Sequence, residues 1–163
     1  LLMILILGGL LVFAVVLFMF RNLLLSVIVL LIGVLGVSGS ALALYLTQTP
    51  LNVGSYTGII MIIGIIGEAS IFTIYLFLDD VQRMQYKEAI IHSISARLRP
   101  KLMTAISAIV ALTPLALGIG TGAQMHQPLA IAVIGGFVIG LPLLLIVLPT
   151  LIYKFVKMNT NQK

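Results

Sequence analysis

The sequence has no cysteine and no tryptophan, and it is poor in charge, with nine basic and four acidic residues among 163. Without cysteine there is no disulfide framework, no thiolate metal site and no cysteine nucleophile. An ordinary soluble domain carries about 25 % charged residues, whereas this chain carries 8 %. So few charges cannot cover a soluble fold of this size. The composition excludes a disulfide scaffold, a disordered chain and a soluble enzyme.

Long apolar runs dominate what is present, and apolar residues make up 61 % of the chain. A membrane-spanning helix needs about 20 predominantly apolar residues. Five stretches qualify, at residues 1–20, 23–46, 56–78, 102–120 and 129–153. The runs lack the alternation of barrel strands. We therefore predict an all-α membrane protein with five transmembrane helices, and we treat residues 1–163 as one transmembrane domain.

The basic residues are placed asymmetrically around these spans. All nine lie at Arg21, within 79–101 or after residue 153, whereas the connecting segments 47–55 and 121–128 contain no Lys or Arg. If the spans alternate, the three basic places share one side, and the positive-inside rule assigns that side to the cytoplasm. The net charge of +5 thus indicates a membrane surface rather than nucleic acid. Leu1 would start on the outer side within an apolar run, so we expect a fragment of a longer protein.

Residues 79–101 form the one long polar segment. Its apolar residues recur at helical spacing and form a single stripe, made of Met84, Ile91, Ile94 and Leu98. The pattern predicts an amphipathic helix over about 80–98, lying on the cytoplasmic interface and ending near Pro100. Asp79 and Asp80 suit the N-terminus of such a helix. The alternative is a surface connector without a function of its own.

Glycines recur at spacings that suit close helix packing. Gly54–Gly58 and Gly136–Gly140 are GxxxG pairs, and a three-residue repeat is formed by Gly33, Gly36 and Gly39. Small residues let helices approach closely in lipid. These positions therefore predict helix–helix contacts.

Only one charge lies deep within a predicted span. Glu68 falls near the middle of the 56–78 stretch, which places it near the bilayer midplane. A carboxylate there costs about 2.5–3.5 kcal/mol on insertion scales, and such residues mark ion or proton pathways. We predict that Glu68 takes up and releases a proton. The alternative is a permanently neutral side chain that hydrogen-bonds between helices.

The other polar residues are weaker candidates when taken alone. Lys101, at the start of the fourth predicted span, is typical of a snorkelling anchor, and Thr104 of a hydroxyl that packs between helices. Met125 and His126 are too few to form a metal site. The sequence contains no Ser/His/Asp set, no HExxH motif and no phosphate-binding loop. It therefore predicts no enzyme activity and no cofactor.

Several stretches together resemble the C-terminal part of resistance–nodulation–division (RND) transporters. They are Arg-Leu-Arg-Pro-Lys-Leu-Met-Thr at 97–104, Pro-Leu-Ala-Leu-Gly-Ile-Gly-Thr-Gly-Ala at 114–123, Pro-Leu-Ala-Ile-Ala-Val-Ile-Gly-Gly at 128–136, and the shorter motifs at 51–55 and 64–68. The resemblance covers essentially the whole chain. It implies a bacterial inner-membrane homotrimer driven by proton influx and built from two repeated halves. This chain would supply the last five spans of the second half.

The resemblance also implies roles for individual residues. Drug-efflux members usually have lysine at the position of Glu68, whereas Glu68 combined with Lys101 resembles the heavy-metal branch, most closely its copper and silver exporters. There the equivalents of Glu68 and Lys101 form a proton relay with an aspartate from the first half. Arg97 and Thr104 match polar positions that support the relay. Met61 could belong to a transmembrane methionine path for metal, although core packing is the commoner role of methionine.

The leading hypothesis is therefore proton-driven efflux of monovalent copper or silver. The implied partners are the remaining half of the same transporter, further copies in a trimer, a periplasmic adaptor and an outer-membrane channel. One alternative is efflux of drugs or other organic solutes by an RND pump. A second is a related membrane factor that uses proton flow in protein secretion.

Overall fold

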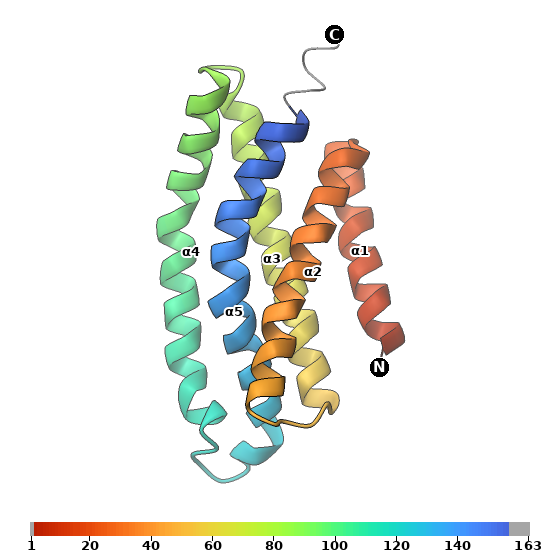
Figure 1. Cartoon of the computed structure of the whole chain (residues 1–163), viewed down its shortest axis with the longest axis vertical. Helices are drawn as coiled ribbons and strands as arrows, with labels where there is room; N and C mark the ends of the chain where they lie inside the picture. The colour runs from red at the N-terminus through yellow and green to blue at the C-terminus, as the bar shows by residue number, and fades with distance from the viewer. Residues whose placement is uncertain (1, 157–163) are drawn as a thin grey trace.

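A computed structural model describes residues 2–156, which form an all-α bundle of roughly antiparallel helices (Figure 1). The helices in chain order are α1 (Leu2–Phe20), α2 (Leu23–Leu46), α3 (Val53–Asp80), α4 (Tyr86–Ala116) and α5 (Ala123–Leu151), followed by a π-helical turn, Ile152–Val156. Leu1, Lys157 and Lys163 lie outside the described residues, and so does the part of the charge pattern that depends on them.

Four helices, α2 to α5, are long and apolar enough to cross a membrane. The apolar stretch of α1, Leu5–Phe20, is shorter, so a fifth span stays a prediction. The α1–α2 turn, the α3–α4 turn and the end of α5 lie at one end of the bundle, and the other two connections lie at the opposite end (Figure 1). The basic and the uncharged connections are thus separated as predicted. That the basic end faces the cytoplasm stays a prediction from the positive-inside rule.

The predicted bounds of the interfacial helix, 80–98, are wrong, whereas its position at the membrane interface stays a prediction. Asp79 and Asp80 end α3 instead of beginning a helix, and α4 runs unbroken from Tyr86 through Pro100 to Ala116. A proline within a helix removes one backbone hydrogen bond, and here contacts to α3 on both sides of it, from Arg97 and Lys101, hold α4 alongside the bundle. Most of the polar segment is therefore the first half of α4, and residues 102–116 of the predicted span at 102–120 are its second half.

Glycines bring the backbones of α2 and α5 into contact. A Cβ atom added to Gly39 would lie 2.8 Å from the carbonyl oxygen of Gly135, and one added to Gly140 would lie 3.2 Å from the Cα of Gly36. A Cβ at 2.8 Å would force atoms apart, and one at 3.2 Å would be tighter than an ordinary contact, so glycine favours this close approach. The packing role is confirmed for the predicted positions Gly36, Gly39 and Gly140, whereas a Cβ on Gly33 would meet no atom within 4 Å.

α3 completes this core, and α4 lies against its edge. Ile62 and Ile66 of α3 are buried and cover the glycines of α2 and α5. At the other end of α3, Phe77 meets the ring of Tyr86 edge-on at 5.5 Å, and the Tyr86 hydroxyl donates to the Ile152 carbonyl oxygen at 2.8 Å. These contacts tie the start of α4 to the end of α5. The rest of α4 is mostly exposed in this chain; its buried residues are Ala89, Ile90, Ser93 and Ala105.

Candidate functional site

An ion pair joins the middle parts of α3 and α4. The Nζ atom of Lys101 donates to Oε1 of Glu68 at 3.3 Å. The two helices run in opposite directions (Figure 1), so two residues 33 positions apart in the sequence lie level with each other. Burying one of these charges alone in lipid would be costly, and the pairing offsets part of that cost.

The pair lies on an outer face of the chain and not inside its five-helix core. The side chain of Glu68 is 56 % exposed and that of Lys101 is 19 % exposed. One turn before Glu68, a Cβ added to Gly64 would meet no atom within 4 Å. The described residues therefore leave this face of α3 uncovered. A carboxylate in contact with lipid is unfavourable, so protein or water from outside this chain is required to cover it.

A second contact lies one helical turn from the ion pair. The guanidinium carbon of Arg97 is 4.7 Å from the centre of the Phe72 ring. Phe72 follows Glu68 by four residues on α3, and Arg97 precedes Lys101 by four on α4, a spacing that makes each pair neighbours on its helix. These four residues form two stacked layers between α3 and α4, which we call the α3–α4 charge ladder. Sequence analysis did not single out Phe72.

Thr104 and Met61 lie near the ladder without joining it. The Thr104 hydroxyl donates to the backbone carbonyl oxygen of Lys101 at 3.0 Å, within its own helix. Met61 is 45 % exposed and lies two turns before Glu68 on the same face of α3. Over residues 2–156, no group of three or more His, Asp or Glu side chains could hold a metal ion. The structure thus brings Glu68 and Lys101 together, places Arg97 one turn away on the Phe72 ring, and adds no ligand set around Met61 among the described residues.

A further acid–base pair, which sequence analysis missed, joins the end of α3 to α4. Nδ1 of His92 lies 2.8 Å from Oδ2 of Asp80. The Asp80 side chain is 7 % exposed and the His92 ring 56 %. An acidic residue at the C-terminus of a helix is disfavoured by the helix dipole. Sequence analysis had placed Asp80 at the start of a helix, where this signal for a partner does not arise. On the exposed turn, Arg83 and Asp79 pair at 3.6 Å.

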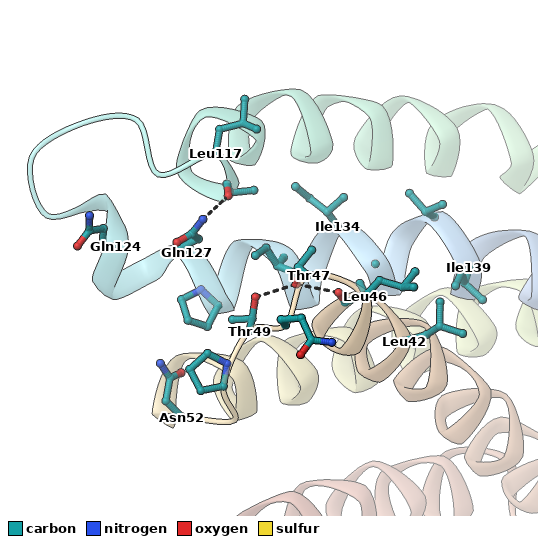
Figure 2. Close-up of a pocket in the computed structure, with 18 residues that line it drawn as sticks. Leu42, Leu46, Thr47, Thr49, Asn52, Leu117, Gln124, Gln127, Ile134 and Ile139 are labelled. Carbon is teal, nitrogen blue, oxygen red and sulfur yellow. Dashed lines mark hydrogen bonds between the residues drawn. The ribbon is translucent and has the colours of Figure 1, made fainter.

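A cavity of about 750 Å³ lies at the opposite end of the bundle, among α2, α5 and the end of α4. Figure 2 shows Gln127 of α5 reaching the end of α4, where its amide nitrogen donates to the Ala116 carbonyl oxygen at 2.8 Å. Thr47 and Thr49 hydrogen-bond to each other on the α2 side (Figure 2). No Asp, Glu, Lys, Arg or His lines this cavity. Its polar side chains are hydroxyls and amides, in contrast to the ionisable pair of the charge ladder.

The fold and the ladder define a multi-pass helical membrane protein with an ionisable pair within its spans. The family model for AcrB/AcrD/AcrF proteins matches residues 1–157. The chain belongs to this family of RND transporters of the inner membrane. Membership confirms the predicted family and the predicted multi-pass membrane location, and it agrees with the prediction that the chain is not an enzyme.

Individual relatives carry two different names. The multidrug resistance protein MdtC of Erwinia tasmaniensis is 36 % identical over 113 residues, which cover 68 % of this chain and 11 % of MdtC. A crystal structure of a heavy metal efflux pump matches 91 % of this chain and 14 % of its own at 33 % identity, with a TM-score of 0.74. A second crystal form of a heavy metal efflux pump matches 80 % of this chain and 14 % of its own at 34 % identity, with a TM-score of 0.70. The chain thus spans only a small part of the proteins that it matches.

Proposed function

We propose that this chain is the C-terminal membrane part of a proton-driven pump that exports monovalent copper or silver, with Glu68 and Lys101 in its proton relay. The observation that carries the proposal is the Lys101–Glu68 contact of 3.3 Å between two spans. Ionisable residues within transmembrane helices mark proton and ion pathways. Glu68 is the only acidic residue of α3 away from its end, so it is the group that binds and releases the proton.

Proton transfer at Glu68 changes the force between α3 and α4. When Glu68 is ionised, the ammonium group of Lys101 balances its charge and links the two helices. When Glu68 takes a proton, the Coulomb attraction to Lys101 falls and this link weakens. A shift between two arrangements of the helices can follow, because the two protonation states favour different distances. The spans before this chain complete the pathway, since alternating access requires both repeated halves.

The uncovered face around Glu68 and Gly64 supports a partner role for the remaining half of the same transporter. In this proposal that half supplies an aspartate facing Glu68 and Lys101, and Arg97 and Thr104 support the relay. The pump is a homotrimer that works with a periplasmic adaptor and an outer-membrane channel. Met61 is a weak candidate for a methionine path along α3, supported only by its exposure on the Glu68 face.

Two observations favour a metal ion as the substrate. The structures of heavy metal efflux pumps match up to 91 % of the chain, and the pairing of Glu68 with Lys101 is the combination that resembles the heavy-metal branch. Efflux of organic compounds is the second candidate, favoured by the 36 % identity to a multidrug resistance protein. Silver export and dye export by the full-length transporter in vesicles separate the two. Dye export without silver export would overturn the metal assignment.

The relay is tested in the full-length transporter. Glu68→Gln keeps the size of the side chain and removes its titration, and we expect at least about a hundredfold loss of proton-coupled transport, the scale of a lost proton-transfer group. Expression and trimer assembly should stay near normal. Glu68→Asp should keep partial activity, because it still titrates with a shorter reach.

Lys101→Ala should resemble Glu68→Gln, and the double variant should lose little more, because residues that act as one unit are not additive. Glu88→Gln, which removes an exposed carboxylate in the first turn of α4, is the matched control and should transport normally. A fully active Glu68→Gln pump would end the relay assignment.

A further inference from the structure

We propose that Phe72 is a positioning residue for the relay: its ring holds the guanidinium of Arg97 away from Glu68 and leaves Lys101 as the cation that pairs with this carboxylate. The inference rests on the proposed proton relay and adds a residue to it. Its basis is the stacked geometry of the α3–α4 charge ladder, in which Lys101 meets Glu68 at 3.3 Å and Arg97 meets the Phe72 ring at 4.7 Å.

Two cations compete for one carboxylate at this place. Arg97 has no acidic side chain within ion-pair distance among residues 2–156. The Glu68–Lys101 layer lies four residues away, about 6 Å along the axis, a distance that the long arginine side chain can bridge. Without another partner, Arg97 would be drawn to Glu68 by simple Coulomb attraction.

Among residues 2–156, no charged side chain other than Lys101 forms an ion pair with Glu68, and none forms one with Arg97. α1 and α2 contain no Asp, Glu, Lys, Arg or His, and α5 contains only His126, near its start. On α3 the other titratable groups are Tyr56, Tyr75, Asp79 and Asp80, and on α4 they are Tyr86, Lys87, Glu88, His92 and Arg99. Asp79 and Asp80 pair elsewhere, with Arg83 and His92. Within the described chain, the partner of Arg97 is therefore the Phe72 ring.

The chemistry of the two cations explains why their arrangement matters. Arginine stacks well on aromatic faces and also grips a carboxylate with two parallel hydrogen bonds, whereas lysine offers a single point charge. A carboxylate gripped by Arg97 would stay ionised and would take up a proton less readily. The negative face of the Phe72 ring attracts the guanidinium, so it keeps the stronger competitor occupied. Lys101 then holds Glu68 in a contact that protonation can break.

The test uses the full-length transporter in membranes and a signal that needs no substrate. The carboxylic-acid C=O band of Glu68 in difference infrared spectra is assigned by its loss in Glu68→Gln. Phe72→Leu keeps an apolar side chain of similar size and removes the ring. We expect the ratio of protonated to ionised Glu68 at a fixed pH to fall about two- to tenfold, the range that a lost cation–π contact implies. The pH profile of transport should move in the same sense, toward lower pH.

Rescue and epistasis separate positioning from simple packing. Phe72→Tyr keeps the ring and should give the native band. In an Arg97→Gln background the competitor is absent, so Phe72→Leu should have no further effect on the band. Tyr75→Leu removes another exposed aromatic ring from α3, one without a cation over it in the described structure, and should leave the band unchanged. If Phe72→Leu does not assemble into trimers, Phe72→Met takes its place.

Each outcome decides the inference. A native band in Phe72→Leu, no rescue by Phe72→Tyr, or an undiminished effect in the Arg97→Gln background would overturn the positioning role. If Glu68→Gln is inactive while Phe72→Leu keeps a native band, the relay stands and only the role of Phe72 fails. If Glu68→Gln is fully active and removes no band, the relay itself fails, and the role of Phe72 fails with it.

Discussion

α4 and α5 are neighbours of similar length, but they are built for different surroundings. In its most apolar window, α5 is 56 % buried within the chain and α4 only 6 %. α5 has no Asp, Glu, Lys or Arg along Ala123–Leu151, whereas α4 carries five such residues: Lys87, Glu88, Arg97, Arg99 and Lys101. His92 adds a titratable ring to α4.

The difference divides the chain into a scaffold and a working face. Glycine contacts fix α2 against α5, and α3 closes over them with Ile62 and Ile66. On its other side α3 presents Glu68 to α4, in a place that the scaffold does not cover. The rigid contacts thus use small and apolar residues, while the proposed chemistry lies where packing within this chain is sparse. Three pairs of substitutions test this division.

The largest effect is expected where a side chain would separate two backbones. In Gly39→Ala the new Cβ would lie 2.8 Å from the Gly135 carbonyl oxygen and 2.8 Å from the Cβ of Ile139. We expect a loss of about 3 kcal/mol in the free energy of unfolding, near the top of the usual range for overpacking, because backbone atoms cannot move aside as a flexible side chain can. Reversible unfolding in detergent micelles measures this loss.

The control for Gly39→Ala lies on the same helix. Gly33→Ala adds a methyl group where no atom lies within 4 Å, so it should be neutral or should stabilise the helix by about 0.5–1 kcal/mol. Similar losses in the two variants would mean that the α2–α5 contact is not the tight scaffold described above.

An isoleucine-to-alanine change, made once in the scaffold and once on the working face, should have a smaller effect on stability than Gly39→Ala. Ile62 is fully buried, and Ile106 on α4 is 59 % exposed. Ile62→Ala should lower the free energy of unfolding by about 2 kcal/mol, the lower end for a buried isoleucine. Lipid is as apolar as the core, so part of the free energy of transferring the side chain out of water is absent. Ile106→Ala should cost less than about 0.5 kcal/mol in this chain. The same unfolding assay compares them.

Repeating the Ile106→Ala measurement in the full-length transporter sharpens the comparison. A cost there that approaches that of Ile62→Ala would show that another part of the protein packs on the outer face of α4. An equal cost in this chain alone would instead contradict the contrast between α4 and the scaffold.

The smallest effect concerns the contact between His92 and Asp80. His92→Leu leaves the nearly buried Asp80 carboxylate without its partner, and we expect a loss of about 1 kcal/mol, at the low end for an unsatisfied buried group, because water can enter where the half-exposed ring stood. Replacing both residues, as in Asp80→Leu with His92→Leu, should recover part of the loss, since no unpaired carboxylate remains. A double variant that is less stable than His92→Leu would show that Asp80 has a role beyond this pair.

The sequence alone determined the class of the protein, the approximate positions of its helices, and Glu68 as the charged residue to explain. These conclusions depend on composition and on the length of apolar runs, which the membrane translates directly into helices. The motif around Lys101 indicated the family, and the match over residues 1–157 confirmed it. Glycine spacing predicted which residues pack closely, because only small residues allow close approach in lipid.

Only the tertiary structure decided how α4 continues and which side chains meet across it. The local pattern predicted an end near Pro100, but contacts to α3 from Arg97 and Lys101 hold the helix on both sides of the proline. The pairs Phe72–Arg97 and Asp80–His92 were missed for the same reason. Periodicity gives the face of each helix, whereas a contact between two helices also depends on their rotation and relative height, which are set by the packing of the whole bundle.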